Sequence, residues 1–295
     1  MAVCKVCPRE CSVDRSIARG FCGVGDEMTV AKIMLHHWEE PCISGAEDSV
    51  GSGAIFFSGC SLKCVYCQNR DISRQGVGRE YSVSELADVI LRLQSEGAHN
   101  INFVTPTHFT LKIIEAVDAV KDRLFIPTVW NTSGYEKTET LRLLEPYIDI
   151  FLTDFKYCSA EKASRYSSAP DYGRVAREAL CEMVKITGKP SFENGMLKKG
   201  TVVRHLVLPG AYKDSIEVLK TVDEAVGHEN AVLSLMAQYT PEFLNDGYGE
   251  INRRVTTFEY EKAVSFALSL GFDGYIQSRG SATSAYTPDF GDSLC

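Results

Sequence analysis

The stretch GAIFFSGCSLKCVYCQN, residues 53–69, carries the pattern on which the predicted fold depends. It joins a short apolar run to three cysteines, Cys60, Cys64 and Cys67, which are separated by three and then by two residues. A four-iron cluster is normally held by four thiolates, so three on one loop leave one iron without a protein ligand. An open metal position is typical of a catalytic site. The spacing therefore predicts a [4Fe-4S] cluster whose free iron binds a ligand that is not part of the protein.

A structural zinc ion is the alternative for these three cysteines. Zinc would need a histidine as its fourth ligand, and no histidine occurs in the thirty residues after Cys67. The apolar residues 54–57 that precede the cysteines also have the character of a strand entering a sheet. Both observations favour the iron-sulfur interpretation.

Composition limits the class of protein. The chain has 295 residues, of which 44% are apolar and 24% charged, which suits one large domain with a full core. A net charge of -8 and a pI near 5.4 argue against general nucleic-acid binding. No uninterrupted apolar segment reaches the roughly 18 residues of a membrane span, and no secretion signal is recognisable. We expect a cytoplasmic protein with no membrane partner.

From residue 53 onward, short apolar runs alternate with longer amphipathic ones, as in repeated strand-helix units. Ser82 and Glu85 form a capping box at the start of one helix. About six units predict an α/β fold, an open partial barrel with functional side chains at the carboxyl ends of its strands. A flat doubly wound sheet would give the same alternation. Strands are predicted at 54–58, 101–105, 126–131, 148–153, 202–208 and 232–236, and further helices at 111–121, 137–144, 175–187, 215–226 and 259–270.

Eleven cysteines without a secretion signal indicate metal ligands, because the cytosol is reducing. A second cysteine set within residues 4–22 has four members, which suits either a structural zinc or a second [4Fe-4S] cluster. Zinc is slightly favoured, because a closed site would stabilise a segment too small to have its own core. This second set consists of Cys4, Cys7, Cys11 and Cys22. No role is assigned to the remaining cysteines, which are Cys42, Cys158, Cys181 and Cys295.

Three regions follow from these patterns. Residues 1–50 form a cysteine-rich metal-binding segment, residues 51–277 the barrel, and residues 278–295 an irregular tail. The run of His36, His37 and Trp38 precedes Glu39 and Glu40 in the first region. Adjacent histidines point in different directions on any regular element, so we predict no metal site there.

The cysteine loop resembles that of the radical S-adenosylmethionine (radical SAM) superfamily, in which the free iron chelates the methionine part of SAM. Tyr66, just before the last cysteine, matches the aromatic residue that such loops place against the adenine. Four further stretches extend the resemblance to relatives of pyruvate formate-lyase activating enzymes, and among these to the PflX-like group. They are GAHNINFVTPTH at 97–108, IPTVWNTSGYE at 126–136, DIFLTDFKY at 149–157 and VVRHLVLPG at 202–210.

The resemblance implies cofactor contacts at the strand ends. Thr105 and Thr107 occupy the place of the Gly-Gly-Glu motif that holds the SAM amino group, although the glutamate is absent here; a plain strand end is the alternative. Arg204 resembles an arginine that faces the SAM carboxylate, and pairing with Asp154 or a surface glutamate is the alternative. Two other segments resemble Asp-Thr-Asn-Gly and Asp-Leu-Lys of the activases, which line the SAM site and a monovalent cation site. Their matching residues are Asn131, Thr132 and Ser133, then Asp154 and Lys156.

Asn131 stands where the activase has an aspartate, so the cation site is in doubt, and Asp154 has helix capping as its alternative role. Several other polar or aromatic residues fall near strand ends and are candidates for the substrate pocket, although a structural role is favoured for each. These are His108, Trp130, Tyr135, His205, Gln238 and Tyr239.

The resemblance implies a reaction. A radical SAM enzyme uses its [4Fe-4S] cluster to cleave SAM reductively to a 5′-deoxyadenosyl radical, which abstracts a hydrogen atom from a substrate. An activase-like oxidoreductase would take that hydrogen from a glycine of a partner glycyl radical enzyme. The alternatives are a lyase or mutase acting on a small molecule, such as an amino acid or modified nucleobase, and an iron-sulfur electron-transfer or carrier protein. The enzyme readings need a reductant such as flavodoxin or ferredoxin.

Overall fold

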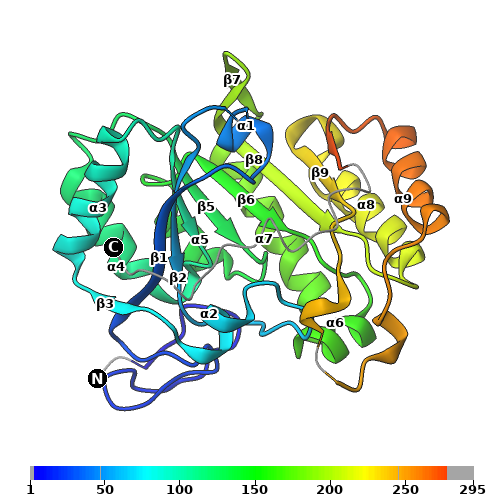
Figure 1. Ribbon diagram of the computed structural model, residues 1–295, viewed down its shortest axis with the longest axis horizontal. Coiled ribbons are helices and arrows are strands. Elements are labelled where there is room, and N and C mark those ends of the chain that lie inside the picture. Colours follow the sequence, from blue (N-terminus) through cyan, green and yellow to red (C-terminus); the bar gives the residue numbers. More distant parts are fainter. Residues whose placement is uncertain (1–2, 47, 245, 278–295) are drawn as a thin grey trace.

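The computed structural model describes residues 3–46, 48–244 and 246–277, and its centre is one large sheet (Figure 1). Across these residues the strand order is β10-β9-β8-β6-β5-β4-β2-β1-β3, with β7 paired to β8. The strands are β1 (Met28–His36), β2 (Ser52–Phe57), β3 (Arg79–Tyr81), β4 (Ile101–Val104), β5 (Thr128–Thr132), β6 (Ile150–Asp154), β7 (Ser191–Glu193), β8 (Met196–Leu206), β9 (Val232–Met236) and β10 (Gly274–Ile276).

The sheet is parallel from β2 to β10 and antiparallel at the other end. Strands β2, β4, β5, β6, β8, β9 and β10 pair in parallel, in that order. Strand β1 pairs antiparallel with β2, and β3 pairs antiparallel with β1. The order ends at β3 and β10, which do not pair within the described residues. The predicted open α/β barrel is therefore confirmed, with β10 as a parallel strand beyond the six predicted units.

Helices connect the parallel strands and cover the outer face of the sheet (Figure 1). The predicted helices are present within a few residues of their expected limits. Strands β1, β3, β7 and β10 have no counterpart in the predictions, because they are short or lie in the cysteine-rich region. The helices are α1 (Pro41–Ser44), α2 (Arg70–Gln75), α3 (Val83–Ser95), α4 (Thr110–Val120), α5 (Thr138–Leu144), α6 (Ala160–Ser167), α7 (Tyr172–Thr187), α8 (Tyr212–Val226) and α9 (Thr257–Leu270).

Period-two alternation along the strands sets which residues face the inside of the barrel. On β5 and β6, Trp130 and Phe151 pack outward in the cluster that contains α3, α4, α5 and α7 residues. Val129, Ile150 and Leu152 pack on the inner face. Successive side chains of a strand alternate between its two faces. Asn131, two residues after Val129, and Asp154, two residues after Leu152, therefore also face inward at the carboxyl ends of their strands.

The inner face is closed at the amino ends of the strands by α1. Cys42 and Ile43 of this helix are fully buried against Val129, Ile150 and Val202. Figure 1 places α1 and α2 at opposite ends of the sheet. Residues 28–44 are thus packed into the barrel, although the boundary predicted from the sequence lies near residue 50.

The predicted capping box at the start of α3 is present. The Ser82 hydroxyl accepts from the Glu85 backbone N–H, and the Glu85 carboxylate accepts from the Ser82 N–H at 2.8 Å. Loss of an N-cap side chain typically costs about 1 kcal/mol. We expect Ser82→Ala to lower the free energy of unfolding by about that amount in urea denaturation. The control is Ser84→Ala, at an exposed position two residues farther along the chain, which should change the free energy of unfolding by less than about 0.5 kcal/mol. Equal losses in the two variants would contradict the assignment.

The predicted tail at 278–295, which contains Cys295, lies outside the described residues. Within the described part, no helix combines the length and the apolar character that crossing a bilayer requires.

Candidate active site

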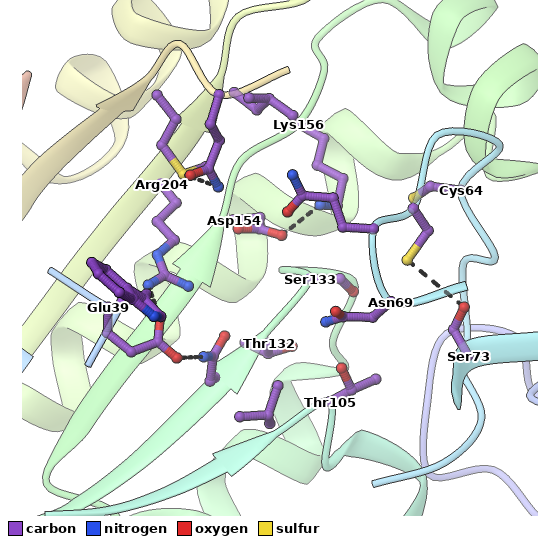
Figure 2. A pocket seen from close by; sticks show the side chains of 18 of the residues that line it. Glu39, Cys64, Asn69, Ser73, Thr105, Thr132, Ser133, Asp154, Lys156 and Arg204 are labelled. Carbon is purple, nitrogen blue, oxygen red and sulfur yellow. Dashed lines mark hydrogen bonds and ion pairs between the residues drawn. The ribbon is translucent and has the colours of Figure 1, made fainter. Parts of the chain in front are cut away.

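A cavity of about 330 Å³ lies on the inner side of the sheet, between the cysteine loop and the segment before α1. Figure 2 shows Cys64 at one end of it, Glu39 and Arg204 at the other, and Asp154 and Lys156 between them. All but one of the residues predicted to contact SAM or its cluster line this cavity. Those that do are Cys60, Cys64, Cys67, Tyr66, Thr105, Asn131, Thr132, Ser133, Asp154, Lys156 and Arg204.

The cysteine loop is held by backbone contacts at both of its sides. The Cys60 N–H donates to the Cys22 carbonyl at 3.1 Å. Arg74 of α2 donates to the Lys63 and Cys64 carbonyls at 2.7 and 2.8 Å. Gly59 has a φ of +91°, and a Cβ there would lie 2.9 Å from the Cys22 carbonyl oxygen. Only glycine fits at this position, because it tolerates positive φ and lets the two segments approach.

The three thiols of this loop have the surroundings expected of cluster ligands. Burial, followed by the nearby Cys64 and Cys60 sulfurs, raises the pKa of Cys67 to about 12. Burial likewise raises the pKa of Cys64. Thiols in such a place need a cationic metal centre to become thiolates. Three thiols on one loop, with Cys64 buried and Cys60 and Cys67 partly buried, therefore fit a [4Fe-4S] cluster.

Within the described residues, no group of three or more His, Cys, Asp or Glu side chains is placed to hold one metal ion.

Ser167 at the end of α6 lies 3.0 Å from the Cys64 sulfur. Its hydroxyl would donate to a Cys64 thiolate, and hydrogen bonds to cluster sulfurs favour the more negative, reduced state. We expect Ser167→Ala to lower the midpoint potential of the reconstituted cluster by tens of millivolts in a redox titration followed by electron paramagnetic resonance. Ser164→Ala, on the exposed side of the same helix, is the control and should leave the potential in place. An unchanged potential in Ser167→Ala would show that the bond does not form in the loaded protein.

Tyr66 is buried beside the cavity. Its ring packs edge-on against Tyr166 and Tyr239, with ring centroids 6.5 and 5.8 Å apart. Its hydroxyl hydrogen-bonds the Tyr157 hydroxyl. These contacts fix the ring at the cavity wall, where a flat adenine could pack against it.

The two threonines of the Thr-Pro-Thr segment differ in position. Thr105 lines the cavity with a φ of +57°, which is strained for a β-branched residue. Thr107 does not line it; its hydroxyl donates to Glu136 at 2.6 Å. Strain of this kind concentrates at functional sites, so Thr105 is the stronger of the two candidates.

Glu136 is a buried carboxyl group that the sequence did not single out. Its Oε1 accepts from Thr107, Thr132 and Trp130, and its Oε2 has no partner in the described part of the chain. Burial raises its pKa from 4.5 to about 7, although the threonine hydrogen bonds oppose the shift.

Glu136 predicts a pH dependence of stability. Because its pKa is higher in the folded state, the stability it contributes is full below about pH 4.5 and is lost as the pH rises through about 7. The shift corresponds to about 3 kcal/mol. We expect Glu136→Gln to flatten the loss of unfolding free energy between pH 5 and pH 8 in chemical denaturation. An identical pH profile in the wild-type protein and the variant would contradict the shift.

The two segments at the ends of β5 and β6 are tied together by Tyr172. Its hydroxyl contacts the Ser133 carbonyl at 2.7 Å and the Asp154 carbonyl at 3.0 Å, and it accepts from the Lys156 N–H. Lys156 donates to Asp154 at 2.5 Å. Burial alone would lower the pKa of Lys156, but the Asp154 carboxylate and the Cys64 thiol raise it well above its usual value. The pair is thus a charged couple beside the cysteine loop.

Arg204 pairs with two buried glutamates rather than with Asp154 or a surface residue. Its Nε and Nη2 donate to the two oxygens of Glu40 at 2.7 and 2.6 Å, and Nη2 also contacts Glu39. Glu39 further accepts from the Asn102 and Asn131 side-chain amides at 3.0 and 3.1 Å. Although burial opposes it, Arg204 holds the pKa of Glu39 below its usual value. Arg204 therefore has its anionic partners within the protein.

The segment before α1 contributes cavity residues that sequence reasoning missed. His36, Trp38, Glu39 and Glu40 all line the cavity. A signal was present: a strand arginine that becomes buried needs an anionic partner, and two adjacent glutamates stand next to Pro41, which begins a helix. The hydrophobic pattern of residues 36–40 does not indicate that this segment packs into the barrel.

The remaining strand-end candidates divide into two groups. Gln238 and Tyr239 line the cavity. His108 and His205 do not, and each bonds a backbone carbonyl at 2.7 Å, of Ser58 and Phe155 respectively. Trp130 and Tyr135 are also outside the set of lining residues.

The four cysteines near the amino terminus lie in a loop region packed beside the cysteine loop. The sulfurs of Cys11 and Cys22 are each 3.5 Å from the place where a Gly20 Cβ would stand. Burial raises the pKa of Cys7 to about 12, with smaller contributions from the charges of Glu136, Cys22 and Cys11. The Cys11 and Cys22 sulfurs therefore lie near each other, and the Cys22 backbone carbonyl links this region to Cys60.

Two arginines attach this region to the barrel. Arg9 donates to the carbonyls of Ser61, Ser167 and Ser168 at 2.7, 3.1 and 2.5 Å. Its guanidinium also lies 4.0 Å from the centre of the Phe21 ring. Arg15 donates to the carbonyls of Gly25 and His108. These contacts pack the cysteine-rich region against the barrel and help to hold the cysteine loop in place.

Comparison with known proteins identifies the family. Residues 54–222 match the model of the radical SAM superfamily, and this range covers the cysteine loop and strands β4, β5, β6 and β8. The chain belongs to the radical SAM superfamily. Members are enzymes, and membership implies a [4Fe-4S] cluster and SAM as cofactors.

Two curated relatives come from Methanocaldococcus jannaschii, and both are described as uncharacterized proteins. One is 32% identical over 92% of this chain and 75% of its own length, and the other 24% identical over 77% and 67%. The solved structure of Streptococcus suis SuiB bound to its precursor peptide SuiA has a TM-score of 0.50 and 14% identity, over 74% of this chain. This chain spans only 46% of the SuiB chain, and the likeness extends to the fold alone.

Proposed function

We propose that this radical SAM protein cleaves SAM reductively and directs the resulting 5′-deoxyadenosyl radical at a substrate hydrogen. One observation carries the proposal: a single cavity contains the three-cysteine loop together with the polar residues at the ends of β4, β5 and β6. When bound, the cluster and SAM supply the electron transfer and the radical. An electron-transfer protein would need no such cavity beside its cluster.

In this proposal each side chain has a positioning task. Cys60, Cys64 and Cys67 hold the cluster, and the buried Tyr66 ring offers a face for the adenine. Lys156, paired to Asp154, places a positive charge where an acidic group of SAM can bind. The other polar side chains proposed for the SAM site are Thr105, Asn131, Thr132 and Ser133, with Arg204 at the far end of the cavity.

The test is reductive SAM cleavage by anaerobically reconstituted protein. With dithionite, or with flavodoxin or ferredoxin as reductant, the protein should form 5′-deoxyadenosine and methionine in equal amounts. Lys156→Met should raise the SAM concentration needed for half-maximal cleavage by about tenfold or more, as expected for loss of one buried ionic contact. Protein with a full cluster that neither binds nor cleaves SAM would overturn the proposal.

For the substrate we propose an activase-like role, in which the radical takes a hydrogen from a glycine of a partner enzyme. Its support is the likeness of residues 126–136 and 149–157 to the activases. A small-molecule lyase or mutase is the second candidate, favoured by the buried charged groups at the inner end of the cavity. A glycyl radical signal on a partner protein, seen by electron paramagnetic resonance, would support the activase-like role. A small molecule that loses a hydrogen atom to the 5′-deoxyadenosyl radical, without such a signal, would support the lyase or mutase.

We further propose that Cys4, Cys7, Cys11 and Cys22 bind a second metal centre, zinc or a [4Fe-4S] cluster. The closeness of the Cys11 and Cys22 sulfurs, and the attachment of this region to the barrel through Arg9 and Arg15, support this. Counting about four irons plus zinc, or about eight irons, distinguishes the two metals. We expect Cys4→Ala to reduce folding yield, whereas loss of SAM cleavage with unchanged folding would contradict a structural role.

A further inference from the structure

The end of the cavity farthest from the cysteine loop has an excess of negative charge. Glu39 reaches it from the segment before α1, and Arg204 reaches it from β8 (Figure 2). Glu40, next to Glu39 in the sequence, lines the same cavity. The side chains of Glu39, Glu40 and Arg204 are 7%, 6% and 14% exposed. Two carboxylates therefore share one guanidinium in a buried place.

Among the described residues, the rest of the cavity lining does not balance this charge. Asp154 is paired with Lys156, so that couple is neutral. Of the described residues that line the cavity, Arg204 and Lys156 are the only lysine or arginine side chains. A buried charge without compensation is costly, so the end formed by Glu39 and Glu40 favours a ligand that brings a positive charge.

A second observation also points to a ligand. His36 lines the same end of the cavity and is 6% exposed, and its Nδ1 has no hydrogen-bond partner among the described residues. Asn102 is fully buried and donates its amide to Glu39. The unpartnered His36 nitrogen leaves room for one more hydrogen bond at this end, and a group with several N–H donors suits the two carboxylates beside it.

We propose that the substrate carries a primary ammonium or guanidinium group that binds against Glu39 and Glu40. This inference rests on the proposed function, because the substrate must lie in the cavity near the radical. A cation removes the excess charge, a neutral group leaves it, and an anion doubles it. Arg204 and the two asparagine amides keep the carboxylates in place, so the site is pre-organised for its ligand. The positive sulfonium of SAM belongs at the other end, beside Cys64.

Simple amines test the charge preference. Reconstituted full-length protein with SAM is titrated by calorimetry with butylamine, butylguanidine, butanol and butyrate, which share one alkyl arm. We expect saturable binding of the two cations, binding of butanol at least tenfold weaker, and no binding of butyrate. Glu39→Gln and Glu40→Gln should each weaken butylamine binding by about tenfold or more, as for loss of one charge-assisted contact. Butyrate binding, or equal binding of butanol and butylamine, would overturn the proposal.

Two further variants control for folding. Glu182→Gln removes another buried glutamate, which pairs with Arg142 outside the cavity, and should bind butylamine like the wild type. Because a single glutamine next to Arg204 can impair folding, the triple variant Glu39→Gln, Glu40→Gln, Arg204→Gln replaces the whole charged group by amides. It should fold and lose its preference for butylamine over butanol; a retained preference would overturn the assignment. Since binding is measured without turnover, failure of SAM cleavage in the wild type would count against the proposed function alone.

Discussion

Cys64→Ala is expected to abolish 5′-deoxyadenosine formation. With only two of the three thiolates left, the cluster would be held too weakly to stay complete, and SAM would then have no stable iron site to bind. Iron content should also fall below the roughly four atoms per chain of a complete cluster. Both are measured on anaerobically reconstituted protein, by chromatography of the nucleoside product and by iron analysis.

Cys181→Ala is the matched control for this experiment. Cys181 lies in α7, away from the cavity, with its sulfur 3.7 Å from the Ala225 carbonyl. This variant should keep the wild-type iron content and rate of SAM cleavage. Persistent cleavage by Cys64→Ala, at a normal rate, would remove the basis of the proposed function.

Gly134→Ala is expected to cause the second large loss. Gly134 has a φ of +78°, and a Cβ there would overlap the backbone oxygen of Asp154 and lie 3.1 Å from the Tyr172 hydroxyl. The overlap is with backbone, so the ends of β5 and β6 must move apart. We expect a loss of about 3 kcal/mol or more in unfolding free energy, together with weaker SAM binding, because both proposed SAM segments shift. Denaturation and SAM titration of the folded fraction measure the two effects.

Gly76→Ala separates steric overlap from backbone strain. Gly76 follows α2 with a φ of +66° and ψ of 31°, and nothing lies within 4 Å of the place for its Cβ. The Gly76→Ala variant should therefore lose only the free energy that a left-handed backbone costs alanine, about 1 kcal/mol. If the two glycine variants lost the same stability, close approach of Asp154 would not be the cause.

The parallel sheet was predictable because short apolar runs alternate with longer amphipathic ones along the chain. Strand β9 begins and ends where the apolar run 232–236 predicts, and the capping box at Ser82 fixes the start of α3. The family resemblance also indicated which strand ends gather around the cavity, and parallel strands all end at one edge. These features depend on residues close together in the sequence.

Other features depend on contacts between distant segments. Nothing local to Glu39 and Glu40 indicates that they pair with Arg204, more than 160 residues away. Strand β1 is hard to recognise because it follows a cysteine-rich stretch and joins the sheet antiparallel. Thr107 looks equivalent to Thr105 in the sequence, but a short turn directs it to Glu136 instead of the cavity.

The hydrogen bond from the Cys60 N–H to the Cys22 carbonyl and the Arg9 contacts limit how far the amino-terminal region can be shortened. A fragment trimmed to the superfamily match would start at residue 54 and would lack both of these supports. Its three ligand cysteines would then sit on a loop with one flank uncovered, open to water and oxygen. We therefore expect the shortest fragment that retains a stable cluster to start before residue 9.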